Sequence, residues 1–264
     1  IEPHQGVGFT GGGKSILPGV AGEDAIKALH SPLLSDHPGV RIGINNNIAR
    51  QEIEEFAARV KVDFIVNLVM GSEHVAPEKN LIKSFSGDVV KAQRQGAEMY
   101  RDFAEVNVPS KADIVLTTPG GYPHDQNLFF SIRGPAAAYL NERPVIKKGG
   151  VVILASECRG GTGEIAAFDL LLNASEPREV TRKVRAPDFY VKGQWCADQW
   201  ARILQDIDII VVTKGVPSSL LERMFMKRAD TVEEAIEMAL DKVGKNGKIL
   251  VMPDGLEALA VLRE

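Results

Sequence analysis

Four short runs of aliphatic residues in the second half of the chain constrain its fold more than any other feature. These Val- and Ile-rich runs lie at residues 112–117, 151–155, 207–212 and 249–252. Continuous apolar runs of this length are typical of strands buried on both faces of a parallel sheet. Helical patterns separate them near residues 127–141, 164–173, 197–205 and 231–243. The alternation predicts an α/β fold with right-handed crossovers, a doubly wound αβα sandwich with a mostly parallel sheet.

The first half has a different pattern. Apolar spacing predicts amphipathic helices over residues 47–60 and 88–103. Alternation predicts a strand over 62–70 and a partner strand over 81–85, with His74 in the turn between them. The segment 106–109 ends in proline and is expected to be a linker. The chain is therefore predicted to hold two domains, residues 1–105 and 106–264.

Charge and cysteine content exclude several classes of protein. A net charge of −4 without a basic cluster gives no reason to expect nucleic acid or an anionic membrane as a partner. Cys158 and Cys196 are far apart, which indicates a reducing compartment and neither a disulfide framework nor a zinc site. No apolar run approaches the ~18 residues of a membrane span. We expect a cytoplasmic protein with no membrane partner.

The first 22 residues contain seven glycines, with His4 before all of them and Lys14 among them. Glycines this dense indicate backbone with positive φ or a close approach to a ligand. The segment from Gly8 to Ser15 fits the phosphate-binding P-loop pattern letter for letter. A P-loop also needs a preceding buried strand and a helix that begins at the lysine, whereas Pro18 follows closely here. A P-loop nucleotide hydrolase and a non-catalytic nucleotide-binding module remain alternatives.

Two further loops, residues 117–127 and 156–164, each follow a predicted strand and open a predicted helix. Both are expected to offer backbone N–H groups at a helix start, which suits an anion. They contain Gly120, Gly121 and His124, and each loop alone is equally well explained as a tight connection. Because both lie at the carboxyl edge of one sheet, we expect a shared binding cleft. Trp200, at helical spacing from Cys196, is expected to pack in the core.

Taken together these motifs resemble the nickel-dependent lactate racemase family. The similarity rests on His4, Gly8 to Gly12, Lys14, Pro18-Gly19 and His30, and it extends to Pro119 to Leu128 and Glu157 to Glu164. The resemblance implies a nickel-pincer nucleotide bound covalently to Lys14, with His30 as the nickel ligand and His4 as one of two acid/base histidines. It also implies that Gly11, Gly12, Gly120 and Gly121 contact the cofactor. Members carry a further α/β segment before this point, so residues 1–105 are expected to be the remainder of a cofactor-anchoring domain.

The implied reaction is racemisation or epimerisation of a 2-hydroxy acid by reversible hydride transfer to the cofactor. Removing hydride while a base takes the hydroxyl proton avoids placing negative charge beside the substrate carboxylate. Histidine suits the base because its ordinary pKa of about 6.5 lies near neutrality. A neutral imidazole also suits Ni(II). The implied partners are a small 2-hydroxy acid and the proteins that mature the cofactor.

The chain departs from the family after Leu128. Where the family has Tyr-Gln-x-x-Lys, this chain has Phe129, Phe130, Ser131, Ile132 and Arg133. Arg133 keeps the positive charge and can bind a carboxylate through its fork, although a solvent-exposed charge on a helix is an equally good interpretation. Phe130 replaces a hydrogen-bonding side chain with apolar bulk. This predicts a 2-hydroxy acid larger than lactate as the substrate.

Overall fold

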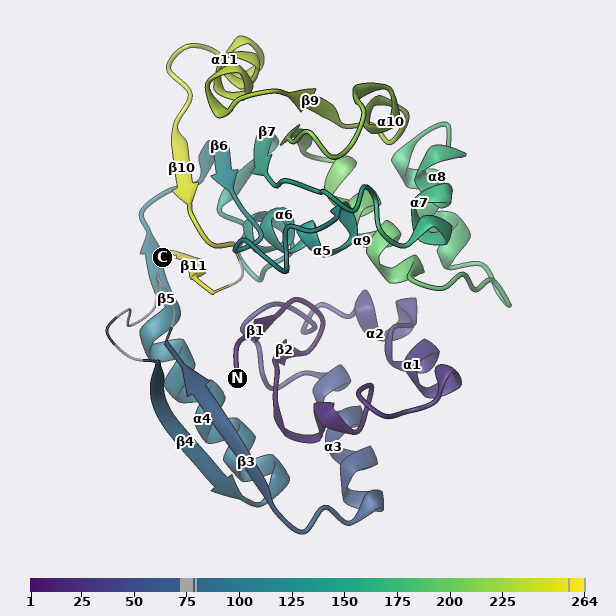
Figure 1. Cartoon of the computed structure of the whole chain (residues 1–264), viewed down its shortest axis with the longest axis vertical. Helices are drawn as coiled ribbons and strands as arrows, with labels where there is room; N and C mark the ends of the chain where they lie inside the picture. The colour runs from purple at the N-terminus through teal and green to yellow at the C-terminus, as the bar shows by residue number, and fades with distance from the viewer. Residues whose placement is uncertain (72–77, 79, 256, 264) are drawn as a thin grey trace. The chain divides into compact units, whose positions relative to one another are not determined.

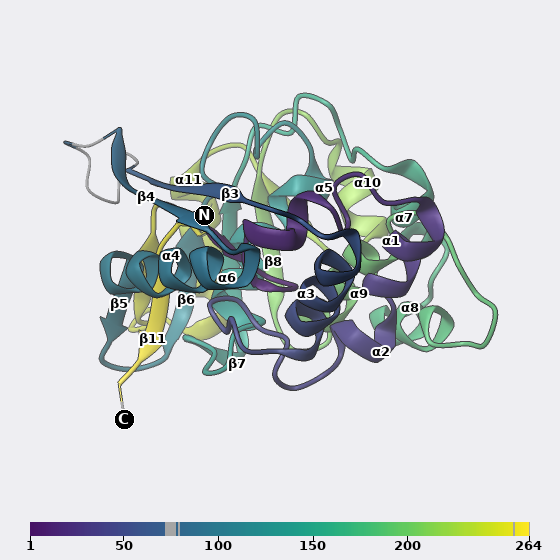
Figure 2. The ribbon, with the colours of Figure 1, turned by 90° about the horizontal axis from the view of Figure 1, so that it is seen from below.

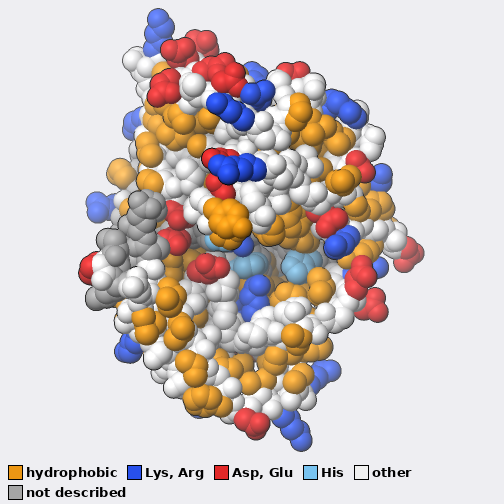
Figure 3. Space-filling view, viewed as in Figure 1, with side chains coloured by type: hydrophobic (Ala, Val, Ile, Leu, Met, Phe, Trp, Pro, Cys, Tyr) orange, Lys and Arg blue, Asp and Glu red, His pale blue; other side chains and the backbone are white. Residues whose placement is uncertain are grey.

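The computed structural model describes residues 1–71, 78, 80–255 and 257–263, so His74 lies outside the described residues. The chain forms two compact units. Unit 1 comprises Ile1–Val106 and Leu256–Leu259, and unit 2 comprises Asn107–Gly255 and Ala260–Glu264. Within the described ranges, none of the helices combines the length and apolar character that crossing a bilayer requires. On the face shown in Figure 3, basic and acidic side chains of the described residues are interspersed.

Unit 2 is built on a five-stranded sheet in the order β10-β6-β7-β8-β9, in which every neighbouring pair is parallel (Figure 1). The strands are β6 (Ala112–Thr117), β7 (Ile146–Ala155), β8 (Asp208–Val212), β9 (Lys227–Ala229) and β10 (Ile249–Met252). The four predicted strands are confirmed. The short edge strand β9 was missed because Lys-Arg-Ala carries no apolar run.

Helices cover both faces of this sheet, as predicted for a doubly wound fold. They are α5 (Leu128–Ser131), α6 (Arg133–Tyr139), α7 (Ile165–Leu172), α8 (Pro177–Val184), α9 (Gln194–Leu204), α10 (Ser218–Arg223) and α11 (Val232–Val243). Helix α11 packs Ala235 and Ala239 against a cluster that includes Ile153. Gly134 of α6 lies against Leu154 instead. Because successive strand residues point to opposite faces, α6 and α11 lie on opposite sides of the sheet.

The predicted helix over residues 127–141 is interrupted between α5 and α6. Pro135 lacks an N–H and cannot donate to the carbonyl of Ser131 four residues earlier. The chain therefore begins a second helix at Arg133, with Pro135 inside its first turn, where the missing donor costs little.

Unit 1 contains the hairpin β1 (Pro3–His4) and β2 (Gly8–Phe9), the 3-10 turn η1 (Gly12–Ser15), and the short helices α1 (Glu23–Leu29) and α2 (Pro32–Ser35). It also contains α3 (Ile48–Val60), an antiparallel pair β3 (Ile65–Met70) and β4 (Leu81–Gly87), and α4 (Val89–Ala104), which packs on both strands (Figure 2). The predicted helices and strands are confirmed. Asn47 caps α3 by accepting from Arg50 N, and Asp88 caps α4 by accepting from Val90 N and Lys91 N.

The boundary between the two units falls inside the predicted linker over residues 106–109, but this segment is a strand and not an irregular connection. Glu105–Val108 forms strand β5, which pairs with β11 (Leu259–Leu262) in a two-stranded sheet. The side chain of Val106 is 53% exposed and that of Val108 is 5% exposed. Because these two residues share one face of the strand, their burial shows no alternation, and the four residues before Pro109 are too few to give a strand period.

Candidate functional site

The glycine-rich segment from His4 to Lys14 is folded against the rest of unit 1, and we call this segment the ribbon. His4 pairs with Gly8 in the β1–β2 hairpin, and Lys14 lies on η1 at the far end of the ribbon. Phe9 is 1% exposed and contacts Tyr100 of α4 edge-on, with ring centroids 6.2 Å apart. The side chains of His4 and Lys14 are both half-buried. A buried aromatic residue therefore fixes the middle of the ribbon between the two candidate functional residues.

The glycines of the ribbon are required by its own packing. Gly8, Gly11 and Gly12 have positive φ. A Cβ on Gly12 would lie 2.8 Å from Cβ of Gln93, and a Cβ on Gly13 would lie 2.8 Å from Cβ of Ala57. The ribbon thus lies directly on α3 and α4. Contact of Gly11 and Gly12 with a cofactor stays a prediction, since protein contacts alone explain these glycines.

His30 lies at the C-terminal end of α1, and its Nδ1 is 2.9 Å from the carbonyl oxygen of Ile26. A carbonyl only accepts, so Nδ1 carries the proton and the ring lone pair is on Nε2. Burial lowers the pKa of His30, the hydrogen bond to Ile26 raises it, and the positive charge of Lys14 lowers it further. His30 is therefore held as a neutral imidazole close enough to Lys14 to feel its charge. This is the form in which histidine binds metals, with the second nitrogen donating to a backbone carbonyl.

His4 is held in the opposite tautomer. The backbone N–H of Gly6 donates to His4 Nδ1 at 3.0 Å, so the neutral ring carries its proton on Nε2. Among the residues that the structure describes, no group of three or more His, Cys, Asp or Glu side chains could hold a metal ion.

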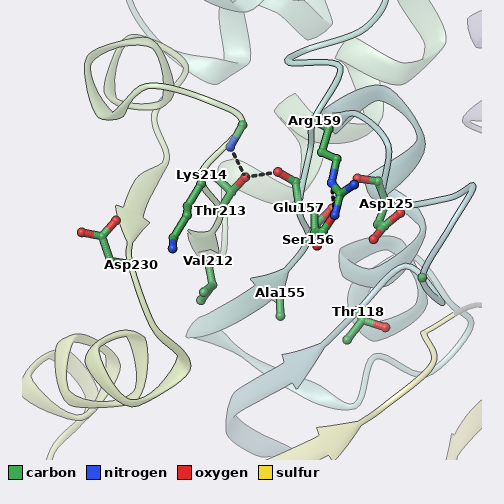
Figure 4. Close-up of a pocket in the computed structure, with 12 residues that line it drawn as sticks. Thr118, Asp125, Ala155, Ser156, Glu157, Arg159, Val212, Thr213, Lys214 and Asp230 are labelled. Carbon is green, nitrogen blue, oxygen red and sulfur yellow. Dashed lines mark hydrogen bonds and ion pairs between the residues drawn. The ribbon is translucent and has the colours of Figure 1, made fainter.

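Unit 2 has a cavity of about 840 Å³ at the carboxyl ends of four strands (Figure 4). Ala155 and Val212, the last residues of β7 and β8, line its base. The remaining lining residues come from the loops after the strands: Thr118, Gly121, Asp125, Ser156, Glu157, Arg159, Thr213, Lys214, Gly215 and Asp230. The cavity lies at the edge where ligands bind in open α/β sheets.

The two predicted loops meet at this cavity and bond to each other. Cys158 N donates to Asp125 O at 2.8 Å, and Gly160 N donates to Gln126 O at 2.7 Å. In return the carbonyls of the second loop accept from Leu128 N and Phe129 N, each at 3.0 Å. The prediction that both helix starts offer N–H groups to a ligand is wrong for α5. Its first N–H groups are already used by the neighbouring loop.

A third loop, after β8, was not singled out from the sequence. Thr213 Oγ1 donates to the carbonyl of Glu157 at 2.8 Å and accepts from Gly215 N at 3.1 Å, which joins this loop to the one after β7. Figure 4 shows Lys214 of this loop on the opposite side of the cavity from Asp125, while Glu157 and Arg159 form an ion pair. The available signal was the position of residues 213–215 directly after a buried strand.

Of the remaining candidates in unit 2, Gly121 lines the cavity, with φ of +71°. Gly120 has φ of +95°, and a Cβ there would lie 3.0 Å from the Asp254 carboxylate oxygens. His124 is not among the described residues that line the cavity. Trp200 is fully buried, which confirms that it packs in the core.

Comparison with known proteins identifies the family. The lactate racemase C-terminal domain model matches residues 107–260, more than half of the chain, and the lactate racemase N-terminal domain model matches residues 1–43. The chain belongs to the lactate racemase family. Two curated relatives are the lactate racemases of Thermoanaerobacterium thermosaccharolyticum, 36% identical over 98% of this chain, and of Lactiplantibacillus plantarum, 34% identical over 97%. The chain spans 59% of the length of each.

Solved structures agree with this assignment. The lactate racemase apoprotein from T. thermosaccharolyticum matches with a TM-score of 0.90 at 36% identity, over all of this chain and 61% of that one. A Thermotoga maritima protein matches with a TM-score of 0.75 at 17% identity, over 99% of this chain and 65% of that one. The second likeness shows the fold alone.

Membership in the lactate racemase family agrees with the local geometry, which is not that of a P-loop. Lys14 lies on a single 3-10 turn, Gly12–Ser15, and no helix begins there. The strands before it form a two-residue antiparallel hairpin. A P-loop requires a parallel strand that leads into a helix whose first N–H groups face the phosphates. The P-loop alternative therefore lacks its structural basis.

The residues that depart from the lactate racemase pattern form an aromatic cluster in unit 2. The ring of Phe129 contacts those of Phe130 and Trp195 edge-on, with centroids 5.5 and 5.2 Å away. Arg133, one turn after Phe129, is half-buried rather than fully solvated. Neither Arg133 nor these aromatic residues are among the described residues that line the cavity.

Proposed function

We propose that the protein is a racemase or epimerase of a 2-hydroxy acid and that it works with a nickel-pincer nucleotide bound covalently to Lys14. The observation that carries the proposal is the arrangement of Lys14 and His30 in a chain of the lactate racemase family. His30 is a neutral imidazole with its lone pair on Nε2, and the charge of Lys14 acts on it. An amine for attachment and a nitrogen ligand are thus supplied by neighbouring side chains.

The donor chemistry of unit 1 fits such a group. His30 would be the nickel ligand, because its Nδ1–H donates to Ile26 and fixes the tautomer that a metal needs. The described residues provide no three-residue metal cluster, so the other donors would belong to the nucleotide. When bound, the nickel-pincer nucleotide supplies a reversible hydride acceptor, which no side chain can provide.

His4 is proposed as an acid/base residue for the substrate hydroxyl. A neutral imidazole has one lone pair, and the N–H of Gly6 meets it on Nδ1. Nε2 can accept a proton only when the ring carries its proton on Nδ1, so the contact with Gly6 must open before His4 acts as a base there. The proposed role therefore treats this arrangement as the resting state of His4.

Arg133 and the aromatic cluster support a substrate larger than lactate. The planar guanidinium of Arg133 is suited to a carboxylate, which every 2-hydroxy acid carries. Phe129, Phe130 and Trp195 add apolar surface, and the methyl group of lactate is too small to cover much of it. We propose a 2-hydroxy acid with an aromatic or branched apolar side chain.

The test uses the chain co-expressed with cofactor-maturation proteins. Stoichiometric nickel and a mass adduct on the Lys14 peptide are expected. Lys14→Ala should abolish the adduct, whereas Lys27→Ala, a matched change at an exposed lysine of α1, should retain it. Absence of nickel and adduct from the wild-type chain would refute the proposal, and reversible nucleotide binding without an adduct would indicate a non-catalytic binding module instead.

Activity is then measured with the loaded protein and a panel of chiral 2-hydroxy acids, by following the loss of optical purity. We expect faster turnover of acids with large apolar side chains than of lactate. Fastest turnover of lactate would contradict the substrate assignment while leaving the reaction class intact.

A further inference from the structure

We propose that Arg50 is a positioning residue that sets the shape of the ribbon between His4 and Lys14. Arg50 lies on α3, and its guanidinium donates to three ribbon carbonyls. Nη1 donates to Gly11 O at 3.2 Å, and Nη2 donates to Val7 O at 3.4 Å and to Phe9 O. These acceptors are alternate residues, and all three lie between His4 and Lys14. One side chain thus holds most of the length of the ribbon.

The burial of Arg50 indicates a requirement that packing alone does not explain. Arg50 is 1% exposed and is among the largest fully buried side chains of the described residues. Burial lowers its pKa to about 10; Glu54 opposes this shift, and Arg94 adds to it. Burying a guanidinium is unfavourable unless its donors are satisfied, and an apolar side chain of similar size would fill the same volume without that cost. The three carbonyl bonds satisfy Nη1 and Nη2, while Nε has no hydrogen-bond partner among the described residues, so these three bonds are the interactions that only an arginine provides here.

A second set of side chains holds the rest of the ribbon. Gln93 of α4 donates to Thr10 O at 3.1 Å and exchanges hydrogen bonds of 3.0 and 3.1 Å with Asn45. Asn67 of β3 accepts from Gly12 N at 3.3 Å. The carbonyls of residues 7, 9, 10 and 11 therefore all accept hydrogen bonds from side chains of α3 and α4, namely Arg50 and Gln93. The path of the backbone that leads to Lys14 is thus fixed by long-range partners in addition to local bonds such as Lys14 N to Gly11 O.

The consequence concerns the reactivity of Lys14. If Arg50 is removed, the carbonyls of Val7, Phe9 and Gly11 lose their common donor, and Val7 O and Gly11 O keep only local backbone bonds. The backbone between His4 and Lys14 then shifts, and this shift changes the surroundings of the Lys14 amine. This inference rests on the proposed role of Lys14 as the attachment site, but its test needs no cofactor.

The test measures how fast an amine-acylating reagent labels Lys14 in the cofactor-free chain, with Lys27 in the same sample as the internal reference. Mass spectrometry gives the Lys14-to-Lys27 labelling ratio. In Arg50→Ala the ratio should change by about two- to tenfold, the range that corresponds to the net free energy of one hydrogen bond. Methylguanidinium should restore the wild-type ratio, and methylammonium should not. Arg59→Ala, which removes an exposed arginine from the same helix, should leave it unchanged.

Each outcome of this experiment supports or overturns the positioning role of Arg50. An unchanged ratio in folded Arg50→Ala, or equal rescue by methylammonium, would overturn the proposal. If Arg50→Ala does not fold, Arg50→Lys and Gln93→Ala take its place. Arg50→Lys should also shift the ratio, because one ammonium cannot bond three separated carbonyls, and a wild-type ratio in both replacements would overturn the proposal. A shifted ratio in a chain whose wild type takes no adduct would refute the proposed function and leave the role of Arg50 standing.

Discussion

Replacing Gly13 by alanine tests how tightly the ribbon lies on α3. Gly13 immediately precedes Lys14, and its φ lies outside the left-handed region, so a Cβ strains no backbone torsion. The added carbon would lie 2.8 Å from Ala57 Cβ, 3.0 Å from Ile53 O and 3.1 Å from Ile53 Cγ2. Ala57 and Ile53 are both 0% exposed, and one contact is helix backbone, so none of the three can swing away.

The magnitude follows from these contacts. Forcing one carbon into a closed, well-packed site costs about 1–3 kcal/mol. Ala57→Gly removes the nearest of the three atoms, but on its own costs about 1 kcal/mol because glycine is a poor helix former. In the double variant the most severe contact is gone. We therefore expect the two changes to cost less together than the sum of their separate effects, with a favourable coupling of at least ~0.5 kcal/mol.

The assay must report on unit 1. Both tryptophans, Trp195 and Trp200, lie in unit 2, so their fluorescence checks only that unit 2 is folded. Hydrogen exchange of the α3 amides measures the stability of unit 1, and the four forms of the double-mutant cycle are compared at one pH. If Gly13→Ala leaves α3 protection unchanged, or if the two effects are additive, the close packing of the ribbon on α3 is refuted.

Three further predictions concern His30, Thr213 and Phe130. In the cofactor-free chain, burial should lower the pKa of His30 below 6.5, so its contribution to stability is present above that pH and lost as the pH falls through the folded-state pKa; an NMR titration that gives 6.5 or more contradicts this. Thr213→Val keeps the side-chain shape but leaves Glu157 O and Gly215 N without their partner, and should cost about 1–3 kcal/mol in urea unfolding; an unchanged midpoint refutes it. In the loaded protein, Phe130→Gln should shift the kcat/KM ratio toward lactate by roughly tenfold, and no shift would remove Phe130 from the substrate site.

The elements that could be predicted were those whose signal is local. The Val- and Ile-rich strands of unit 2 are buried on both faces, so their composition alone marks them. Helices α3 and α4 carry both an apolar period and a capping residue, Asn47 and Asp88. The short strands β5 and β9 have too few residues for a period, and only pairing with β11 and β8 makes them strands.

The candidate site divides in the same way. The spacing of His4, Lys14 and His30, together with the glycine motif around Lys14 and the two loops of the second half, suggested the family and the type of chemistry. The cavity of unit 2 was predicted from two loops, but the contribution of Lys214 was missed because a lysine after a strand is usually only solvated. The glycines were expected to face a ligand or take positive φ, and the structure adds a third reason, close contact with α3 and α4.

By itself the sequence determined the parallel α/β architecture of the second half and the identity of the residues that carry the proposed chemistry. Both depend on patterns within a few tens of residues, where composition and spacing act directly. Only the tertiary structure decided that His30 is buried within range of the charge of Lys14, and that a buried arginine holds carbonyls 39 to 43 positions away in the chain. Such partners are chosen when distant segments exclude water together, because a buried donor must then find whatever acceptor the closed fold places beside it.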